Sequence, residues 1–260
     1  MNNLKARFTG AFRFWQRNAD VFRSHYLSSV VGNIGEPLLY LFGLGAGIGG
    51  MIEKVDGIPY LQWIAPGMMA AAAMNAAAFE CTFGAYTRMV EQKVYEGVLA
   101  TPLEVEDVVL GEILWGATKG LMSSAILLLV LSALGLFDRW ASVPFLLIEM
   151  ALFGTVFAAL TMCVTAVSKS YEFFNYFFTL FLTPLLVFSG IWFPVARLPA
   201  WLSSFFLIFP TPHAVNIARY LFHGGGVIMP IIGILCLAAC APVLIWLAMR
   251  LVRRRLIPAP

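Results

Sequence analysis

The chain has 260 residues, of which 60% are apolar and only 12% are charged. An average soluble domain has about 25% charged residues, so a soluble globule of this size could not hide so much apolar surface. The composition also excludes disordered, collagen-like and disulfide-scaffold proteins. The sequence therefore predicts an all-α membrane protein that crosses the bilayer several times.

The N-terminal segment 4–24 predicts an amphipathic helix that lies in the membrane surface. Apolar side chains recur at three- and four-residue steps, and the basic residues lie mostly off that face. This combination is typical of interfacial helices, with an amphipathic helix packed on protein as the alternative. The residues that we assign to the interfacial helix are Phe8, Phe12, Trp15, Arg17 and Phe22.

Six apolar stretches are each long enough to cross a bilayer, which takes about 20 helical residues. These spans cover 27–50, 60–84, 107–135, 142–168, 173–194 and 227–249. The ionisable residues within them or near their ends are Glu36, Glu80, Glu112, Lys119 and Glu149. Charges are costly at this depth in the membrane. One interpretation is a polar path such as a proton relay. The alternative is that these residues form internal ion pairs or extend their side chains to the membrane interface. Glu112 and Lys119 are seven residues apart and share one helix face.

A further uncharged stretch, 198–218, is predicted to enter the membrane and return, because prolines on both sides of Thr211 would break a crossing helix. With six crossings, twelve of the 17 Lys and Arg residues lie on the side of both termini and four on the other. The positive-inside rule then places both termini in the cytoplasm and 195–223 outside, as a re-entrant helical hairpin between the fifth and sixth spans. The residues that we assign to this outer lid are Ser189, Gly190, Phe193, Pro194, Pro199, Trp201, Pro210, Pro212, His213 and Arg219.

The cytoplasmic segment 86–99 is the most charged part of the middle of the chain and predicts a short amphipathic helix. Thr101 is expected to cap the next helix, with Pro102 in its first turn and Glu104 as the capping-box partner. A solvated loop would not need this construction, whereas a docking element for a cytoplasmic partner would. The candidate docking residues are Arg88, Met89, Glu91, Lys93, Val94, Glu96, Gly97, Thr101 and Pro102.

The chain shows no motif for nucleotide binding or hydrolysis, since Walker A, HExxH and GxSxG patterns are absent. Its four cysteines lack metal-ligand spacing. We therefore expect no enzyme activity, cofactor or metal in this chain, and an energy source in an ion gradient or a separate ATPase. The alternatives are a proton-coupled secondary transporter, an intramembrane serine protease that uses Ser189 and His213, and a membrane-anchored assembly factor.

Four features occur in a characteristic order. They are the surface helix before Glu36-Pro37; Ala65-Pro66-Gly67 with the run Arg88-Met89 to Pro102-Leu103; Ser189-Gly190-Ile191-Trp192-Phe193-Pro194; and Pro210-Thr211-Pro212-His213 with Arg219. Together they resemble the permease subunit of type 2 ABC exporters, most closely the branch that exports nodulation factors, which are lipo-oligosaccharides.

The resemblance implies a homodimer of permeases in the bacterial inner membrane, with two cytoplasmic ATPase subunits that hold ATP and Mg. It implies that 86–99 is the coupling helix in the ATPase groove, and that 195–223 is the lid of the exit. The expected substrates are amphipathic, namely lipid-linked glycans, lipo-oligosaccharides or hydrophobic drugs, and they move outward. Membrane lipid is an expected contact and nucleic acid is not.

Overall fold

The computed structural model describes residues 2–24, positions 35, 39, 42, 43 and 47, and residues 54–257. Most of the predicted first span, 27–50, and with it Glu36, lies outside the described residues. The described part is mostly helical. Its elements are α1 (Asn2–Arg23), β1 (Lys54–Val55), β2 (Ile58–Pro59), α3 (Tyr60–Phe79), η1 (Glu80–Gly84), η2 (Thr87–Glu91), α4 (Val94–Leu99), α5 (Val105–Ala133), η3 (Trp140–Ser142), α6 (Val143–Val167), α7 (Tyr171–Phe177), η4 (Phe178–Leu182), α8 (Thr183–Val187), η5 (Val195–Arg197), α9 (Ala200–Phe206), α10 (Pro210–His223) and α11 (Ile228–Leu256).

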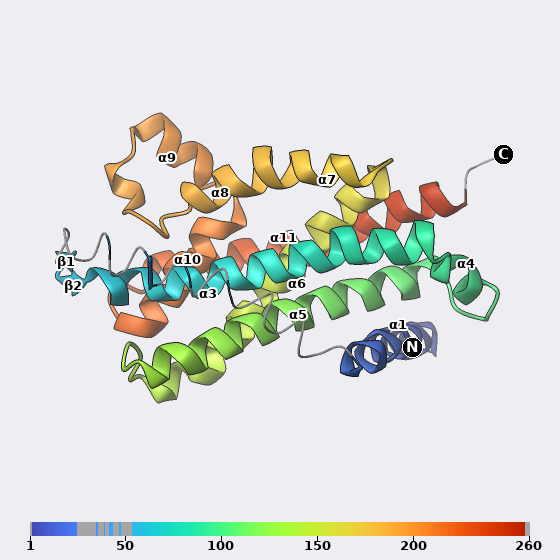
Figure 1. Cartoon of the computed structure of the whole chain (residues 1–260), viewed down its shortest axis with the longest axis horizontal. Helices are drawn as coiled ribbons and strands as arrows, with labels where there is room; N and C mark the ends of the chain where they lie inside the picture. The colour runs from blue at the N-terminus through green and yellow to red at the C-terminus, as the bar shows by residue number, and fades with distance from the viewer. Residues whose placement is uncertain are drawn as a thin grey trace.

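Four long helices, α3, α5, α6 and α11, form a bundle, and α6 contacts the other three (Figure 1). Small residues allow their backbones to approach closely. The alanines of 70–73 in α3 are all buried. A Cβ added at Gly120 of α5 would lie 2.8 Å from the Ala73 carbonyl oxygen, and one at Gly154 of α6 would lie 3.3 Å from the Ala117 carbonyl oxygen. The bundle core is therefore held by close helix packing.

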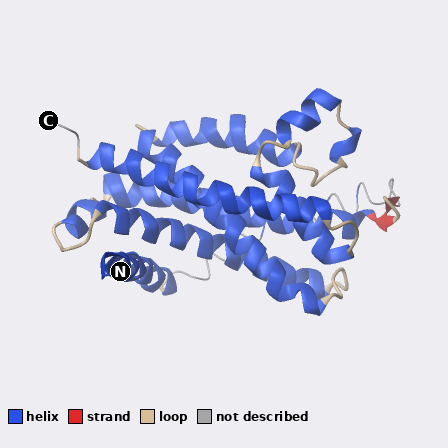
Figure 2. Ribbon diagram, turned by 180° about the vertical axis from the view of Figure 1, so that it is seen from behind, coloured by secondary structure: helices blue, strands red, loops and turns tan. Residues whose placement is uncertain are grey.

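The helix α1 packs on the first half of α5 and runs across the bundle helices, as Figures 1 and 2 both show. A Cβ at Gly111 of α5 would lie 2.8 Å from the Ala11 carbonyl oxygen, so the two helices touch. One face of α1 buries Ala11, Phe14 and Asn18, and the opposite face exposes Phe12. The helix is thus both packed on protein and open on one side.

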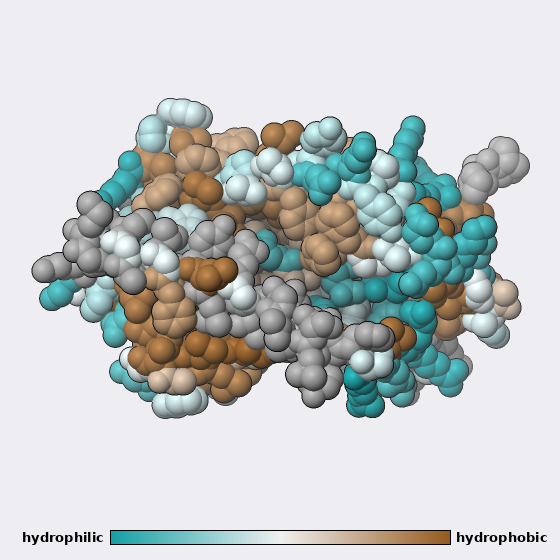
Figure 3. All heavy atoms as spheres, viewed as in Figure 1, coloured by the Kyte–Doolittle hydropathy of each residue, from teal (hydrophilic) through white to brown (hydrophobic). Residues whose placement is uncertain are grey.

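Three helical segments of the described part are long and apolar enough to cross a membrane, namely Val105–Ala133, Trp140–Val167 and Ile228–Leu256, and Tyr171–Val187 is a shorter apolar helix. The helix α11 leaves large apolar side chains such as Leu235 and Trp246 exposed, which suits contact with lipid. On the face drawn in Figure 3, hydrophilic residues gather toward the α4 end of the bundle. These features are those of a multi-pass membrane protein.

The ends of the bundle are distinct. The helix α4, the end of α11 and α1 lie toward one end, and the β1–β2 hairpin, α9 and α10 lie toward the other (Figure 1). The hairpin pairs Lys54 with Pro59 and Val55 with Ile58, and its turn has positive φ at Asp56 and Gly57, as a tight Asp-Gly turn requires.

Several helix boundaries differ from the sequence prediction. The helix predicted as the second span continues beyond residue 84 through two π-helical segments, η1 and η2, to Glu91. The segment 86–99 is therefore split, and only Val94–Leu99 forms the separate helix α4. The fifth span contains the π-helical segment η4 and ends at Val187, before Gly190 with a φ of +85°. The sixth extends to Leu256, into the arginine tail.

Candidate functional site

A buried ion pair joins the continuation of α3 to α5. The Arg88 guanidinium on η2 donates from Nε to Glu112 Oε1 and from Nη2 to Glu112 Oε2, both over 2.7 Å. The Glu112 side chain is fully buried. Two parallel bonds of this kind are the strongest arginine–carboxylate geometry. The pair therefore fixes these two helical segments relative to each other.

Two further side chains bind the same carboxylate. The Tyr95 hydroxyl on α4 donates to Glu112 Oε1 over 3.0 Å, and Asn18 Nδ2 on α1 donates to Glu112 Oε2 over 3.2 Å. The Arg17 guanidinium in turn donates to Asn18 Oδ1 over 2.9 Å. Glu112 thus connects α5 to the N-terminal helix α1 and to the two neighbouring segments η2 and α4.

Glu80 supplies a second carboxylate, 2.8 Å from Arg88 Nη1. Arg88 is therefore paired with two carboxylates. Burial, followed by the Glu112 charge, raises the pKa of the Tyr95 phenol. Tyr95 therefore stays a neutral donor at physiological pH.

The helix α4 has one face held by this network and one face open. Its N-cap Lys93 has a φ of +50°, which turns the chain after η2. Tyr95 is fully buried, whereas Glu96 and Gly97 are exposed. Among the other candidate docking residues, Glu91, Lys93, Thr101 and Pro102 are exposed, Val94 is half-buried and Met89 is buried.

The start of α5 corrects the prediction for Thr101. Its hydroxyl donates to the Val98 carbonyl over 2.6 Å and so closes the end of α4. The capping box lies three residues later: the Glu104 side chain accepts from the Asp107 backbone, and Asp107 Oδ2 accepts from the Glu104 N–H over 3.0 Å. The helix begins at Val105 because this acidic pair satisfies its first free donors.

The same end of the bundle is tied to the α6–α7 turn and to the end of α11. The Tyr86 hydroxyl donates to the Lys169 carbonyl over 2.8 Å. Arg255 Nη1 donates to the carbonyls of Thr165 and Ser168 at the end of α6, over 2.6 Å each. Cationic donors favour a helix C-terminus. The π-helical continuation of α3 and the arginine tail therefore meet at this turn.

The residues of the predicted interfacial helix have different environments. Trp15 Nε1 donates to Thr118 Oγ1 over 3.0 Å. The Phe22 ring packs edge-on against Trp115, and the Lys119 ammonium lies 4.0 Å from the Phe22 ring centroid. Phe12 is exposed, and the side chain of Phe8 lies outside the described part. Lys119 is therefore a partner of α1 and not of Glu112.

At the opposite end, Arg219 of α10 connects α10 and the segment after α8 to the bundle. Its Nη2 donates to the Gly190 carbonyl over 2.8 Å, and its guanidinium carbon lies 4.0 Å from the Trp63 ring centroid on α3. His223 bonds the Gln62 carbonyl over 3.1 Å. These contacts hold α10 and the segment after α8 against the start of α3.

The prolines of this region begin helices and do not interrupt them. Pro210 and Pro212 stand in the first turn of α10, where no backbone donor is lost, and Pro199 precedes α9. Pro194 precedes η5 in the same way. Neither α9 nor α10 is a candidate span. The Trp201 side chain is exposed.

Ser189 and His213 are each engaged with backbone. Ser189 Oγ donates to the Leu186 carbonyl over 2.7 Å, and His213 Nε2 bonds the Leu207 carbonyl over 2.8 Å. The Phe193 ring packs edge-on against Phe188. Within the described residues, no hydrogen bond joins Ser189 to His213, so this geometry does not support a protease dyad.

Glu149 is buried on α6, and neither of its carboxylate oxygens has a hydrogen-bond partner among the described residues. It contacts neither Glu80 nor Lys119 through a hydrogen bond or ion pair in that part of the chain. The predicted intramembrane charges thus separate: Glu80 belongs to the Arg88 network, Lys119 to α1, and Glu149 stands by itself.

Sequence reasoning missed three members of the network, Glu112 as its centre and Tyr95 and Asn18 as donors. The pairing could have been inferred from the fact that a carboxylate such as Glu112 needs a cationic partner inside a membrane protein. Arg88 is such a cation on the adjacent segment. The seven-residue spacing to Lys119 directed attention to the wrong partner.

Comparison with known proteins gives the family. The model of the family described as "ABC-2 type transporter" matches residues 11–223. The chain is 39% identical over 246 residues to "Nodulation protein J" of Rhizobium meliloti, covering 94% of this chain and 93% of that protein. It is 40% identical over 246 residues to "Nodulation protein J" of Sinorhizobium fredii, covering 94% and 92%.

A more distant relative is the "Inner membrane transport permease YadH" of Escherichia coli, 23% identical over 222 residues, with 81% of each chain covered. These findings confirm the resemblance to type 2 ABC exporter permeases. Permeases of this family are not themselves enzymes, and the family implies an ATPase partner. The chain therefore belongs to the ABC-2 type transporter family, as a transmembrane permease subunit of an exporter.

Proposed function

We propose that this permease forms the membrane pathway of an exporter driven by a separate ATPase, with α4 as the coupling helix. The observation that carries the proposal is the two-sided character of α4. Its Tyr95 side is bonded to Glu112 in the buried network, and its Glu96–Gly97 side is exposed. A partner that moved α4 would therefore move α5 and the continuation of α3 with it.

The route of this motion follows from the contacts. A displacement of α4 reaches Glu112 through Tyr95, and Glu112 is bonded to Arg88. From the same segment, Tyr86 is bonded to the α6–α7 turn at Lys169. Packed elements with well-satisfied ion pairs shift as units and not by gradual deformation. ATP-driven closure of two ATPase subunits, which hold ATP and Mg, is the proposed source of the push.

The membrane arrangement of the proposal is six crossings with both termini in the cytoplasm of a bacterium, in the inner membrane. The asymmetry of Lys and Arg supports this orientation. The position of α1, α4 and the end of α11 at one end of the bundle also supports it. A second copy of the chain is proposed to complete the pathway as a homodimer.

The proposed substrate is an amphipath that moves outward: a lipo-oligosaccharide, a lipid-linked glycan or a hydrophobic drug. The similarity to proteins named "Nodulation protein J" supports the first of these classes. The outer pair α9 and α10 is the proposed lid of the exit. The contact between Arg219 of α10 and Trp63 of α3 supports this role, because it attaches the lid to the bundle and could keep the exit closed between transport cycles.

The experiment that tests coupling uses the permease reconstituted with its ATPase subunit in vesicles. Glu96→Ala and Gly97→Trp change only the exposed side of α4, and a Cβ at Gly97 meets no atom within 4 Å. We expect both variants to insert and fold, and to lower the amount of substrate exported per ATP hydrolysed. Asp138→Ala removes an exposed carboxylate at the opposite end of the bundle and serves as the control. Unchanged export with both α4 variants would reject the assignment of α4.

A further inference from the structure

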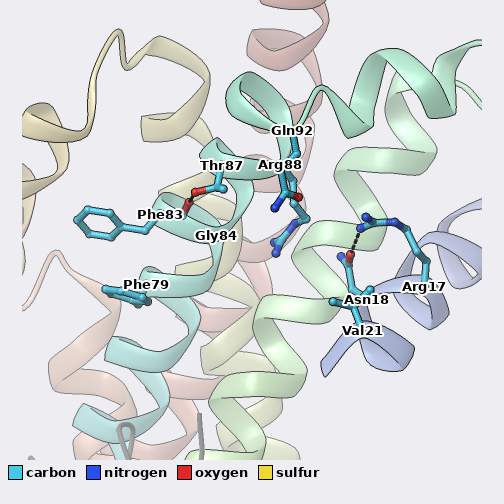
Figure 4. A pocket seen from close by; sticks show the side chains of 9 residues that line it. All are labelled: Arg17, Asn18, Val21, Phe79, Phe83, Gly84, Thr87, Arg88 and Gln92. Carbon is cyan, nitrogen blue, oxygen red and sulfur yellow. Dashed lines mark hydrogen bonds between the residues drawn. The ribbon is translucent and has the colours of Figure 1, made fainter. Parts of the chain in front are cut away.

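A cavity of about 320 Å³ lies between α1 and the continuation of α3. Figure 4 shows Arg17 and Val21 on α1 at one side of the cavity, and Arg88 on the continuation of α3 pointing toward them. Phe79 and Phe83 also line the cavity, and their rings project to the side of the continuation away from α1. Pockets that bind small ligands have about 300–1,000 Å³. The cavity therefore fits a polar headgroup and the beginning of an apolar chain.

Both walls of the cavity change from apolar to polar in the same direction. Along the continuation of α3, Phe79 is followed by Arg88 and Gln92, and along α1, Val21 is preceded by Arg17 at the level of the polar end (Figure 4). The polar end lies toward α4. In the proposed membrane arrangement this is the cytoplasmic surface, so the cavity has the polarity of a lipid in the inner leaflet.

The two arginines of the cavity differ in whether they form ion pairs with carboxylates. Arg88 is bonded to Glu80 and Glu112. Arg17 donates to the neutral side chain of Asn18, and no ion pair links it to a carboxylate within the described residues. Burial, and after it the charge of Arg88, lowers the pKa of Arg17, although the charge of Glu112 acts in the opposite direction. An anion in the cavity would offset both effects.

Gly84 keeps the middle of the cavity open. A Cβ at this position would lie 2.8 Å from Glu80 Oε1 and 3.3 Å from Arg88 Nη1. A side chain here would therefore displace the Glu80–Arg88 pair and intrude on the space between the aromatic and the polar ends. The Phe79 and Phe83 rings stack with their centroids 4.8 Å apart, and Phe79 is more than half exposed.

We propose that this cavity binds an anionic amphipath of the inner leaflet, with its acidic headgroup on Arg17 and its first apolar segment against Phe79 and Phe83. The proposal rests on the membrane arrangement of the proposed function and is independent of the ATPase. Two sources share this chemistry. One is a resident anionic phospholipid, and the other is an acidic headgroup of the transported amphipath.

The test measures lipid binding to the purified full-length permease without ATPase, by native mass spectrometry with phosphatidylglycerol and phosphatidylcholine. We expect preferential retention of phosphatidylglycerol, and Arg17→Gln to weaken it roughly tenfold, as for the loss of one charge-assisted hydrogen bond. Arg13→Gln removes an exposed cation from the same helix, outside the cavity, and should leave retention unchanged. Equal effects of both variants would overturn the proposal, and so would equal retention of both lipids by a permease that also shows no Arg17-dependent binding of an added acidic lipo-oligosaccharide.

A steric variant tests the cavity without removing charge. Val21 is exposed on the cavity side of α1, so Val21→Trp fills the space and leaves the fold and Arg17 in place. We expect lower retention of phosphatidylglycerol. Gln16→Trp adds the same bulk to an exposed position of α1 that does not line the cavity and should have no effect. Full retention by Val21→Trp would place the lipid elsewhere and refute the site.

The source is identified by what co-purifies with the permease from cells that make no lipo-oligosaccharide. Phosphatidylglycerol retained by the unmodified chain and lost from Arg17→Gln indicates a resident phospholipid. A cavity that takes up ligand only when an acidic lipo-oligosaccharide is added, and only with Arg17 present, indicates the transported amphipath. Both results support the site, and the absence of any Arg17-dependent ligand in either preparation rejects it. Because no ATP is used, a failure here leaves the coupling proposal standing.

Discussion

Arg88 and Glu112, which are 24 residues apart, form two parallel hydrogen bonds of 2.7 Å each inside the protein. The chain between them contains α4, whose Tyr95 returns to the same carboxylate. The loop that holds α4 is therefore anchored at both of its ends and in its middle. This arrangement makes α4 a rigid extension of the bundle and not a mobile loop on its surface.

Glu112→Gln is expected to destabilise the fold strongly. The variant leaves the buried Arg88 with a single carboxylate, Glu80. Loss of one partner of a buried ion pair typically costs about 3–5 kcal/mol, because the remaining charge stays desolvated. The measurement is the free energy of unfolding of the detergent-solubilised permease, followed by circular dichroism.

Glu106→Gln is the matched control, because it removes another arginine-paired carboxylate from the same helix. Glu106 is paired with Arg253 over 2.7 Å, but the Arg253 side chain is 61% exposed. Exposed ion pairs contribute about 0–1 kcal/mol. An equal loss of stability in both variants would mean that burial of the Arg88–Glu112 pair does not increase its contribution to the free energy of unfolding.

Tyr95→Phe should separate coupling from stability. The change removes the donor to Glu112 and keeps the ring, whose edge contact with Phe14 remains. The expected loss of stability is about 1 kcal/mol, the usual net value of one hydrogen bond. The amount of substrate exported per ATP should fall, because α4 is less firmly joined to α5. Tyr176→Phe, at an exposed position of α7, is the control, and an identical export ratio in the two variants would contradict the route through Tyr95.

Gly120→Ala and Gly97→Ala should have opposite effects on stability. A Cβ at Gly120 would meet the Ala73 carbonyl oxygen at 2.8 Å, so α3 and α5 must move apart. Overpacking of this kind costs about 1–3 kcal/mol. At Gly97 the space is open, and alanine should stabilise α4 by about 0.5–1 kcal/mol. Thermal unfolding of the two variants side by side tests the difference in sign.

Much of the fold follows from patterns along single segments of the sequence. The periodicity of residues 4–24 predicts α1, and the family resemblance is confirmed by the match to the ABC-2 type transporter family. Such patterns act within one helix. The pairing of Glu112 with Arg88 depends on how two helices pack, so a spacing of seven residues on one helix could not predict it.

Two local features were beyond prediction for different reasons. The π-helical segments η1 and η2 carry α3 to Glu91, and nothing in the composition of 80–91 distinguishes them from an ordinary helix. At the start of α5, Thr101 and Glu104 are both acceptable caps. Thr101 bonds Val98 instead, because α4 ends there. The sequence predicts a helix over 86–99, but it does not show that this segment is split and that only Val94–Leu99 forms a separate helix.

Arg219→Lys should loosen the outer helices from the bundle. Arginine stacks on Trp63 and donates to the Gly190 carbonyl at the same time, and a lysine ammonium cannot reproduce this planar arrangement. We expect the free energy for local opening of 186–223 to fall by about 1–2 kcal/mol, measured by amide hydrogen exchange. Arg197→Lys, at an exposed position of the same region, should leave exchange unchanged. Faster exchange in Arg219→Lys alone identifies the contact with α3 as the one that holds the outer helices closed, whereas equal exchange in both variants would place that restraint in other contacts of α10.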